Sequence, residues 1–251
     1  MNPDPPVVFG VFMFWLLCAL VSSAASLEEV QTVVHDSELY RPHLISEYAS
    51  TFPADVYAQA ASGKIVTGLD PVPGQTIRKA WAVGVIQSDV RTVWAALRDF
   101  GLRSDYSRVG YSELQTGEAC VSGRTVFQHL PVPMLSDRWW VSKLTHSDAL
   151  EVNSGGKAFE LSFVASTDES GLRTASARAW SKKAVPIASS QGAYFIYAVN
   201  DHETLVEYHL MSDPGGYVPS SLANAFATGG VRDSLEALAK LSHDGSRCPK
   251  Q

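Results

Sequence analysis

The most distinctive stretch of the chain is Ser212-Asp213-Pro214-Gly215-Gly216-Tyr217-Val218-Pro219. Neighbouring proline and glycine residues mark a turn, and Pro219 fits the first position of a helix. The sequence that follows carries an apolar stripe at helical spacing, made of Leu222, Phe226, Val231, Leu235, Leu238 and Leu241. This stripe predicts an amphipathic helix packed against the rest of the domain. Gly229 and Gly230 lie inside it, and since each costs a helix about 1 kcal/mol relative to alanine, we expect a kink or break there.

Before this turn the chain reads as a series of short strands. The candidates are residues 111–116, 123–130, 137–145, 150–153, 158–166, 173–182, 191–199 and 204–211. Short runs at this spacing, with turn residues Asn200-Asp201 between the last two, predict a consecutive antiparallel sheet. Because several strands are apolar on alternate positions, one face needs a cover, and the terminal helix is the obvious candidate. The fold class is therefore α+β.

The first third of the chain adds helices and a strand pair. Residues 26–61 predict two or three short helices, interrupted by Pro42 and Pro53. Alternating apolar residues at 65–69 and 77–86 predict two strands. Residues 89–100 then predict a helix that Ser88 can cap and Gly101 can end.

The amino terminus is an apolar segment. Residues 7–21 carry no charge and are followed by Ser22-Ser23-Ala24-Ala25-Ser26. A core of about 7–15 apolar residues is typical of a signal peptide, and cleavage after Ala24 or Ala25 fits its small-x-small rule. Asp4 and the absence of Lys or Arg before the segment depart from that pattern, so an uncleaved anchor is the alternative. We expect export to the periplasm or secretion, with inner-membrane anchoring through residues 7–25 as the other possibility.

Composition excludes several classes of protein. Of 251 residues, 45% are apolar and 18% charged, which excludes general disorder. The 26 acidic and 20 basic side chains give a net charge of −6, without the basic excess of a nucleic-acid binder. No phosphate-binding glycine motif, serine-nucleophile elbow or metal-ligand spacing is present. We therefore expect no metal, cofactor or catalytic residue.

Two motifs resemble a known family. Met134-Leu135-Ser136-Asp137-Arg138-Trp139-Trp140-Val141 follows Leu130-Pro131-Val132-Pro133, and the turn at 213–219 leads into the terminal helix. Together and in this order they resemble the START family of lipid-binding domains, within the Bet v 1-like, or helix-grip, superfamily. At the start of this strand the family more commonly has Asp-Tyr, and the doublet Trp139-Trp140 departs from that pattern. The resemblance covers about residues 63–241.

The resemblance implies a curved antiparallel sheet around a long carboxy-terminal helix, with a hydrophobic tunnel for one lipid. Together with the segments described above, the chain then divides into a signal peptide or anchor (1–25), a helical preamble (26–62), a START-like domain (63–243) and a polar tail (244–251). The implied function is binding of a phospholipid or sterol, for transfer or sequestration in the cell envelope of a Gram-negative bacterium. The implied partners are the lipid and, transiently, a membrane, and we expect a monomer.

The candidate lipid-binding residues lie on the strands and the terminal helix that would enclose this tunnel. They are Arg138, Trp139, Trp140, Tyr194, Tyr208, Leu222 and Phe226. Arg138 would meet a phosphate, or else pair with an acid at the tunnel mouth. One tryptophan of the doublet should face inward and the other outward. The tyrosines would offer hydroxyls or a cage for a choline group, or else pack as ordinary core.

Three questions stay open from the sequence. The superfamily also contains cyclases and aromatases, and Glu207 and His209, on one strand face, could form an acid–base pair that Arg138 might join. A ligand-sensing partner protein is a further alternative. Cys120 and Cys248 form a disulfide or remain free thiols.

Overall fold

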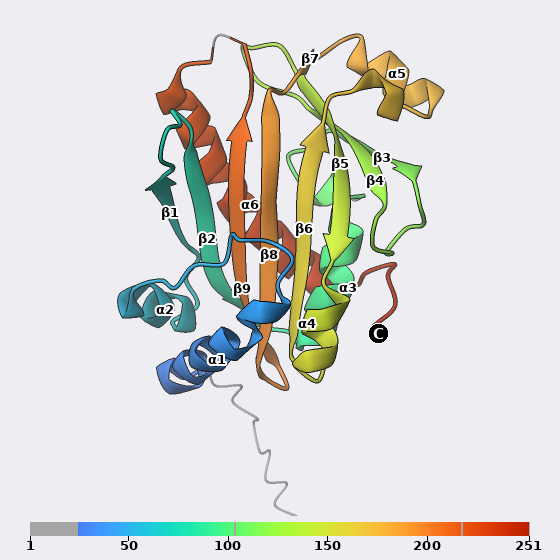
Figure 1. Ribbon diagram of the computed structural model, residues 1–251. Coiled ribbons are helices and arrows are strands. Elements are labelled where there is room, and N and C mark those ends of the chain that lie inside the picture. The colour runs from blue at the N-terminus through green and yellow to red at the C-terminus, as the bar shows by residue number, and fades with distance from the viewer. Residues whose placement is uncertain (1–24, 103, 217, 251) are drawn as a thin grey trace, which may run out of the picture.

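A computed structural model describes residues 25–102, 104–216 and 218–250. The expected signal peptide or anchor, apart from Ala25, lies outside the described residues, as do Arg103, Tyr217 and Gln251. The described chain folds around one sheet (Figure 1). Its strands are β1 (Val66–Pro71), β2 (Arg78–Ile86), β3 (Tyr111–Thr116), β4 (Thr125–Leu130), β5 (Arg138–His146), β6 (Ala158–Ser166), β7 (Val185–Pro186), β8 (Ser189–Asn200) and β9 (Glu203–Asp213).

The helices lie on both sides of this sheet. They are α1 (Leu27–Tyr40), α2 (Ala54–Ala61), α3 (Val90–Phe100), α4 (Asp148–Asn153), α5 (Ala175–Ser181) and α6 (Ser220–Asp244), with 3-10 turns at Arg41–His43, Ser104–Tyr106 and Glu169–Gly171. The amino-terminal segment thus forms short helices separated at Pro42, as expected.

The sheet is antiparallel throughout except for β7, which pairs in parallel with β5. Its order is β1-β2-β9-β8-β6-β5-β4-β3, so the second strand of the chain lies beside the last. In Figure 1, α6 crosses behind the sheet while α1 and α2 lie in front of it. The expected helix-grip arrangement, a curved antiparallel sheet with a carboxy-terminal helix on one face, is confirmed.

Alternation along β9 defines two faces of the sheet. Val206 and Tyr208 belong to the inner face, which α3 and α6 cover. Leu205 belongs to the outer face, where it packs with Val56 and Tyr57 of α2. Because successive side chains of a strand point to opposite sides, each strand supplies both cores.

The helix α6 runs unbroken through Gly229 and Gly230, so the expected break is absent. The apolar stripe after the glycines explains this continuity: Val231, Leu235, Leu238 and Leu241 are buried against the inner face and α3. Burial of four large side chains outweighs the cost of two glycines. Pro219 precedes the helix as its cap residue rather than standing at the first helical position.

Two expected strands are helices instead. Residues 150–153 fall in α4, where the Ser147 side chain accepts a hydrogen bond from the Leu150 amide at 3.2 Å. Most of residues 173–182 form α5, where the Thr174 side chain accepts a hydrogen bond from the Ala177 amide at 3.1 Å. A capping hydroxyl and helix-favouring alanines outweigh the strand pattern there. The predicted helix at 89–100 is present as α3, but its cap is Asp89 rather than Ser88.

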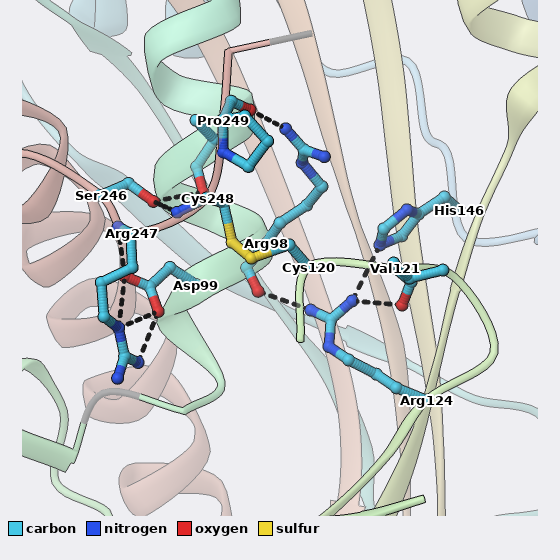
Figure 2. Close-up of a disulfide and its surroundings, with 11 residues drawn as sticks. Arg98, Asp99, Cys120, Val121, Arg124, His146, Ser246, Arg247, Cys248 and Pro249 are labelled. Carbon is cyan, nitrogen blue, oxygen red and sulfur yellow. Dashed lines mark hydrogen bonds and ion pairs between the residues drawn. A yellow bond between two sulfur atoms is a disulfide. The ribbon is translucent and has the colours of Figure 1, made fainter. Parts of the chain in front are cut away.

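A disulfide joins Cys120 to Cys248, which answers the question that the sequence leaves open (Figure 2). Cys120 lies between β3 and β4, and Cys248 lies in the tail after α6. The tail is also tied to α3, because the Ser246 hydroxyl donates to the Ala95 carbonyl at 2.9 Å. Arg247 pairs with the buried Asp99 at 2.6 Å. The polar tail is therefore fixed against the domain over residues 246–249.

Candidate functional site

A cavity of about 740 Å³ lies between the inner face of the sheet and the first half of α6. Its floor comes from alternate residues of strands β4, β5, β6, β8 and β9, and its roof comes from Phe226, Ala227 and Gly230 of α6. The end of α3 and the loop at 130–135 complete the wall. The size and the apolar lining are those of a site for a small hydrophobic ligand.

A small polar cluster interrupts the apolar wall. Gln128 on β4 accepts hydrogen bonds at its Oε1 from the Trp140 indole at 2.8 Å and the Ser142 hydroxyl at 3.0 Å. Trp140 and Ser142 are neighbours on the inner side of β5. Among the described residues, the Gln128 amide nitrogen has no acceptor. The cluster can therefore donate a hydrogen bond to a ligand oxygen.

Two tyrosines form another part of the floor. Tyr194 on β8 and Tyr208 on β9 stack with ring centroids 3.9 Å apart and planes 4° from parallel. Burial raises the pKa of Tyr208 to about 12 and that of Tyr194 well above its ordinary value. Both rings are thus neutral, flat surfaces at any physiological pH. They suit an apolar ligand and can also offer a hydroxyl.

Arg138 lines the cavity, but its guanidinium is bound to the backbone. Its Nε donates to the Pro214 carbonyl at 2.6 Å, and its Nη2 donates to that of Gly215 at 3.3 Å. Its Nη1 donates to the carbonyls of Ser136 and Asp137. The side chain is only 5% exposed. Arg138 therefore holds the turn before α6 against the start of β5.

The other sequence candidates separate into two groups. Trp140, Tyr194, Tyr208 and Phe226 line the cavity together with Arg138. Trp139 points to the opposite side of β5 and packs with Phe127, Leu172 and Ala177. Leu222 lies exposed on α6, outside the cavity lining.

The acid–base pair considered from the sequence lies on the outer face. Glu207 accepts a hydrogen bond from the Tyr57 hydroxyl at 3.3 Å, and the His209 ring stacks on Phe52 at 5.6 Å. Neither side chain lines the cavity, where Arg138 lies. The suggestion that Arg138 joins this pair is therefore wrong, because the sheet separates them.

Several lining residues were missed from the sequence. At the mouth, Arg108 forms an ion pair with Asp233 of α6, and both line the cavity. Their pairing joins residues far apart in the chain, which no local pattern indicates. For Gln128 and Ser142 a signal did exist. Ser142 follows Trp140 by two residues, so strand alternation places both side chains on one face, and Gln128 on β4 is the register partner of Trp140.

Comparison with known proteins gives structural matches alone. No protein-family model and no curated protein sequence matches the chain. A fragment of the STAR-related lipid transfer protein from Xanthomonas axonopodis superposes with a TM-score of 0.59 at 21% identity, covering 79% of this chain and 99% of that one. Human StAR-related lipid transfer protein 5 gives 0.57 at 12% identity, covering 87% and 97%. Human STARD10 gives 0.57 at 14% identity, covering 84% and 79%.

At these identities the likeness shows the fold. Within the part of the chain that the structure describes, no helix has both the length and the apolar character needed to cross a membrane.

Proposed function

The chain has the START, or helix-grip, fold, and we propose that it binds one lipid in the cavity beneath α6. The observation that carries the proposal is the cavity itself: about 740 Å³ of mostly apolar space in the interior of a folded domain. Water makes few hydrogen bonds to an apolar wall, whereas burying the hydrocarbon of a lipid against it is favourable by about 25 cal/mol per Å² of apolar surface. Two of the superposed structures are named as lipid transfer proteins, which supports this function. Binding and carriage need no covalent step.

We propose further that the ligand has an uncharged headgroup, such as a sterol or another hydroxyl-bearing lipid. The charged side chains that line the cavity are already engaged, Arg108 with Asp233 and Arg138 with backbone carbonyls. An anionic phosphate would have to compete with Asp233 for Arg108, or with the backbone carbonyls for Arg138. The polar cluster of Gln128, Trp140 and Ser142 instead offers a neutral hydrogen-bond donor.

The mouth of the cavity supports transient membrane contact. Apolar side chains are exposed on both of its sides: Met134 and Leu135 on the loop before β5, and Leu222 and Phe226 on α6. Exposed apolar residues gathered beside a lipid cavity favour insertion into a bilayer surface. We propose that the chain exchanges its lipid there, and that export through residues 7–25 places it in the cell envelope.

The first test fills the cavity. Ala227→Trp places an indole in the roof, so we expect lipid uptake from liposomes to fall at least tenfold while the protein stays folded. Ala225→Trp is the matched control, because Ala225 lies on the exposed side of the same helix. Uptake is measured with labelled sterol and labelled phospholipid in parallel.

The outcomes separate the two parts of the proposal. Stoichiometric sterol uptake that Ala227→Trp abolishes supports both. Stoichiometric phospholipid uptake would retain the carrier function and overturn the uncharged headgroup. Uptake of no lipid class by the unaltered protein would overturn the carrier function.

A further inference from the structure

Glu203, the first residue of β9, is a buried carboxylate with neutral partners. It is 2% exposed. Its Oε1 accepts from the backbone nitrogen of Ala25 at 2.8 Å and from Gln87 Nε2 at 2.7 Å. Its Oε2 accepts from Asn200 Nδ2 at 2.8 Å. Across the described ranges, no Lys, Arg or His lies within ion-pair distance of it. Burying a charged carboxylate without a cation costs free energy. A positive charge next to Glu203 would therefore stabilise the folded protein.

The nitrogen that meets Glu203 belongs to a residue held firmly in place. Ala25 is 5% exposed and packs in the outer-face core with Val30 and Ala60. The next residue, Ser26, caps α1, and its backbone nitrogen donates to Glu29 Oε2 at 2.8 Å. Within the described chain, Ala25 is thus the first residue of the outer-face core, and its nitrogen points at a buried acid.

The sequence before Ala25 has the character of a removable segment. An uncharged run at residues 7–21 is followed by small residues, with Ser22 and Ala24 at the −3 and −1 positions of an Ala24–Ala25 bond. Ala24 lies outside the described residues. The sequence leaves cleavage after Ala24 and after Ala25 equally open.

We infer that the bond between Ala24 and Ala25 is hydrolysed and that the new α-ammonium of Ala25 is the counter-charge of Glu203. A peptidase that accepts small residues at −3 and −1 adds water across the amide. Ala24 keeps the carboxyl group, and the amine released on Ala25 takes up a proton at neutral pH. The hydrogen bond at 2.8 Å becomes a buried, charge-assisted one.

Cleavage one residue later fits the structure worse. It would remove the buried Ala25 side chain from the outer-face core and take away one of the three donors to Glu203. The new ammonium would then lie on Ser26, beside the exposed Glu29. An ammonium near a helix start opposes the helix dipole, and the acids Glu28, Glu29 and Glu203 offset that effect for Ala25.

The test begins with the whole chain, expressed with its own amino-terminal segment in a bacterial host that exports proteins. Intact mass and amino-terminal sequencing of the purified protein should show a chain that starts at Ala25. A chain that starts at Ser26, at any other residue, or that retains residues 1–24 would overturn the inference.

A second measurement tests the charge pair. An amine-reactive reagent at neutral pH labels the α-amine, and a paired ammonium reacts slowly because its pKa is raised. We expect labelling about tenfold faster in Glu203→Gln, which corresponds to one pKa unit. Glu29→Gln is the matched control and should change the rate far less than Glu203→Gln does, because Glu29 is exposed and bonds the Ser26 nitrogen rather than that of Ala25. Equal rates in Glu203→Gln and the unaltered protein, or acceleration in Glu29→Gln alone, would contradict the pairing.

Discussion

The two halves of α6 differ in how far their apolar side chains are buried. In residues 220–230, the cavity half, Ala223 is buried, whereas Leu222 and Phe226 are exposed. In residues 231–244, the anchored half, Val231, Leu235, Leu238 and Leu241 are all buried. The disulfide follows immediately. The difference teaches that the anchored half stabilises the fold, while the cavity half borders the ligand site and contributes little to stability.

The largest effect should come from the disulfide beside the anchored half. The two cysteines are separated by 128 residues. Replacing both by serine releases that loop in the unfolded chain and should lower the free energy of unfolding by about 4 to 5 kcal/mol. Urea unfolding of the variant and of the reduced protein should agree. If the variant unfolds at the same urea concentration as the oxidised protein, the tail does not anchor the helix.

The same substitution in each half compares them directly. Leu238→Ala removes a fully buried side chain and should cost about 2 to 5 kcal/mol. Leu222→Ala removes an exposed one and should change stability by no more than about 0.5 kcal/mol. Chemical denaturation measures both. Equal costs would contradict the division of the helix into two halves.

Acid should weaken the anchored end through His146. Burial, followed by the charges of Arg124 and Arg98, lowers the pKa of His146 to about 3. Its Nε2 lies 3.2 Å from Arg124 Nη1, close to the disulfide (Figure 2). Below pH 6.5 the His146 imidazole binds a proton in the unfolded chain but stays neutral in the folded protein. Stability should therefore fall by about 1.4 kcal/mol per pH unit from this group alone, until the pH approaches 3.

The variant His146→Gln checks this slope. Between pH 6.5 and 5 its stability should depend on pH less steeply than that of the unaltered protein, by about 2 kcal/mol over the interval. His202→Gln, at an exposed turn, should leave the slope unchanged. A slope that His146→Gln does not alter would show that this histidine is charged in the folded protein.

The smallest effect lies at the junction of the two halves. A Cβ at Gly230 would meet no atom within 4 Å, because the position borders the cavity. Gly230→Ala should therefore stabilise the protein by about 1 kcal/mol in thermal unfolding and leave lipid uptake intact. Gly192→Ala gives the opposite control, since its Cβ would collide with the His209 carbonyl. Loss of stability in Gly230→Ala would mean that the helix needs a flexible residue there.

The sequence predicts the fold wherever a pattern is long or a motif is specific. The turn at 213–219 carries a specific proline and glycine motif. The helix after it and the strands β8 and β9 carry apolar residues at regular spacing. Short elements are different. The helices α4 and α5 depend on one capping hydroxyl each, from Ser147 and Thr174, and such a local hydrogen bond outweighs a brief strand pattern.

The candidate site is predicted less completely, for a topological reason. Which member of the doublet Trp139-Trp140 faces the cavity depends on register, since a shift of one residue exchanges the two faces. Arg138 donates hydrogen bonds to the turn at Pro214 and Gly215, and Arg108 pairs with Asp233. Both contacts join segments that are distant in the sequence. Periodicity cannot supply such contacts, although it does place Tyr194 and Tyr208 on inward-facing strand positions.

The strand order has a consequence for how the chain assembles. The strand β2 has β9 as its inner neighbour, with Ala80 opposite Leu210 and Ile86 opposite Thr204. During synthesis, the hairpin of β1 and β2 leaves the ribosome early and keeps one open edge until β9 has been made. Until β9 pairs with it, such an edge can form hydrogen bonds with strands of other chains. Folding of this protein therefore depends on long-range pairing late in synthesis, which makes it slow and exposes the nascent chain to aggregation.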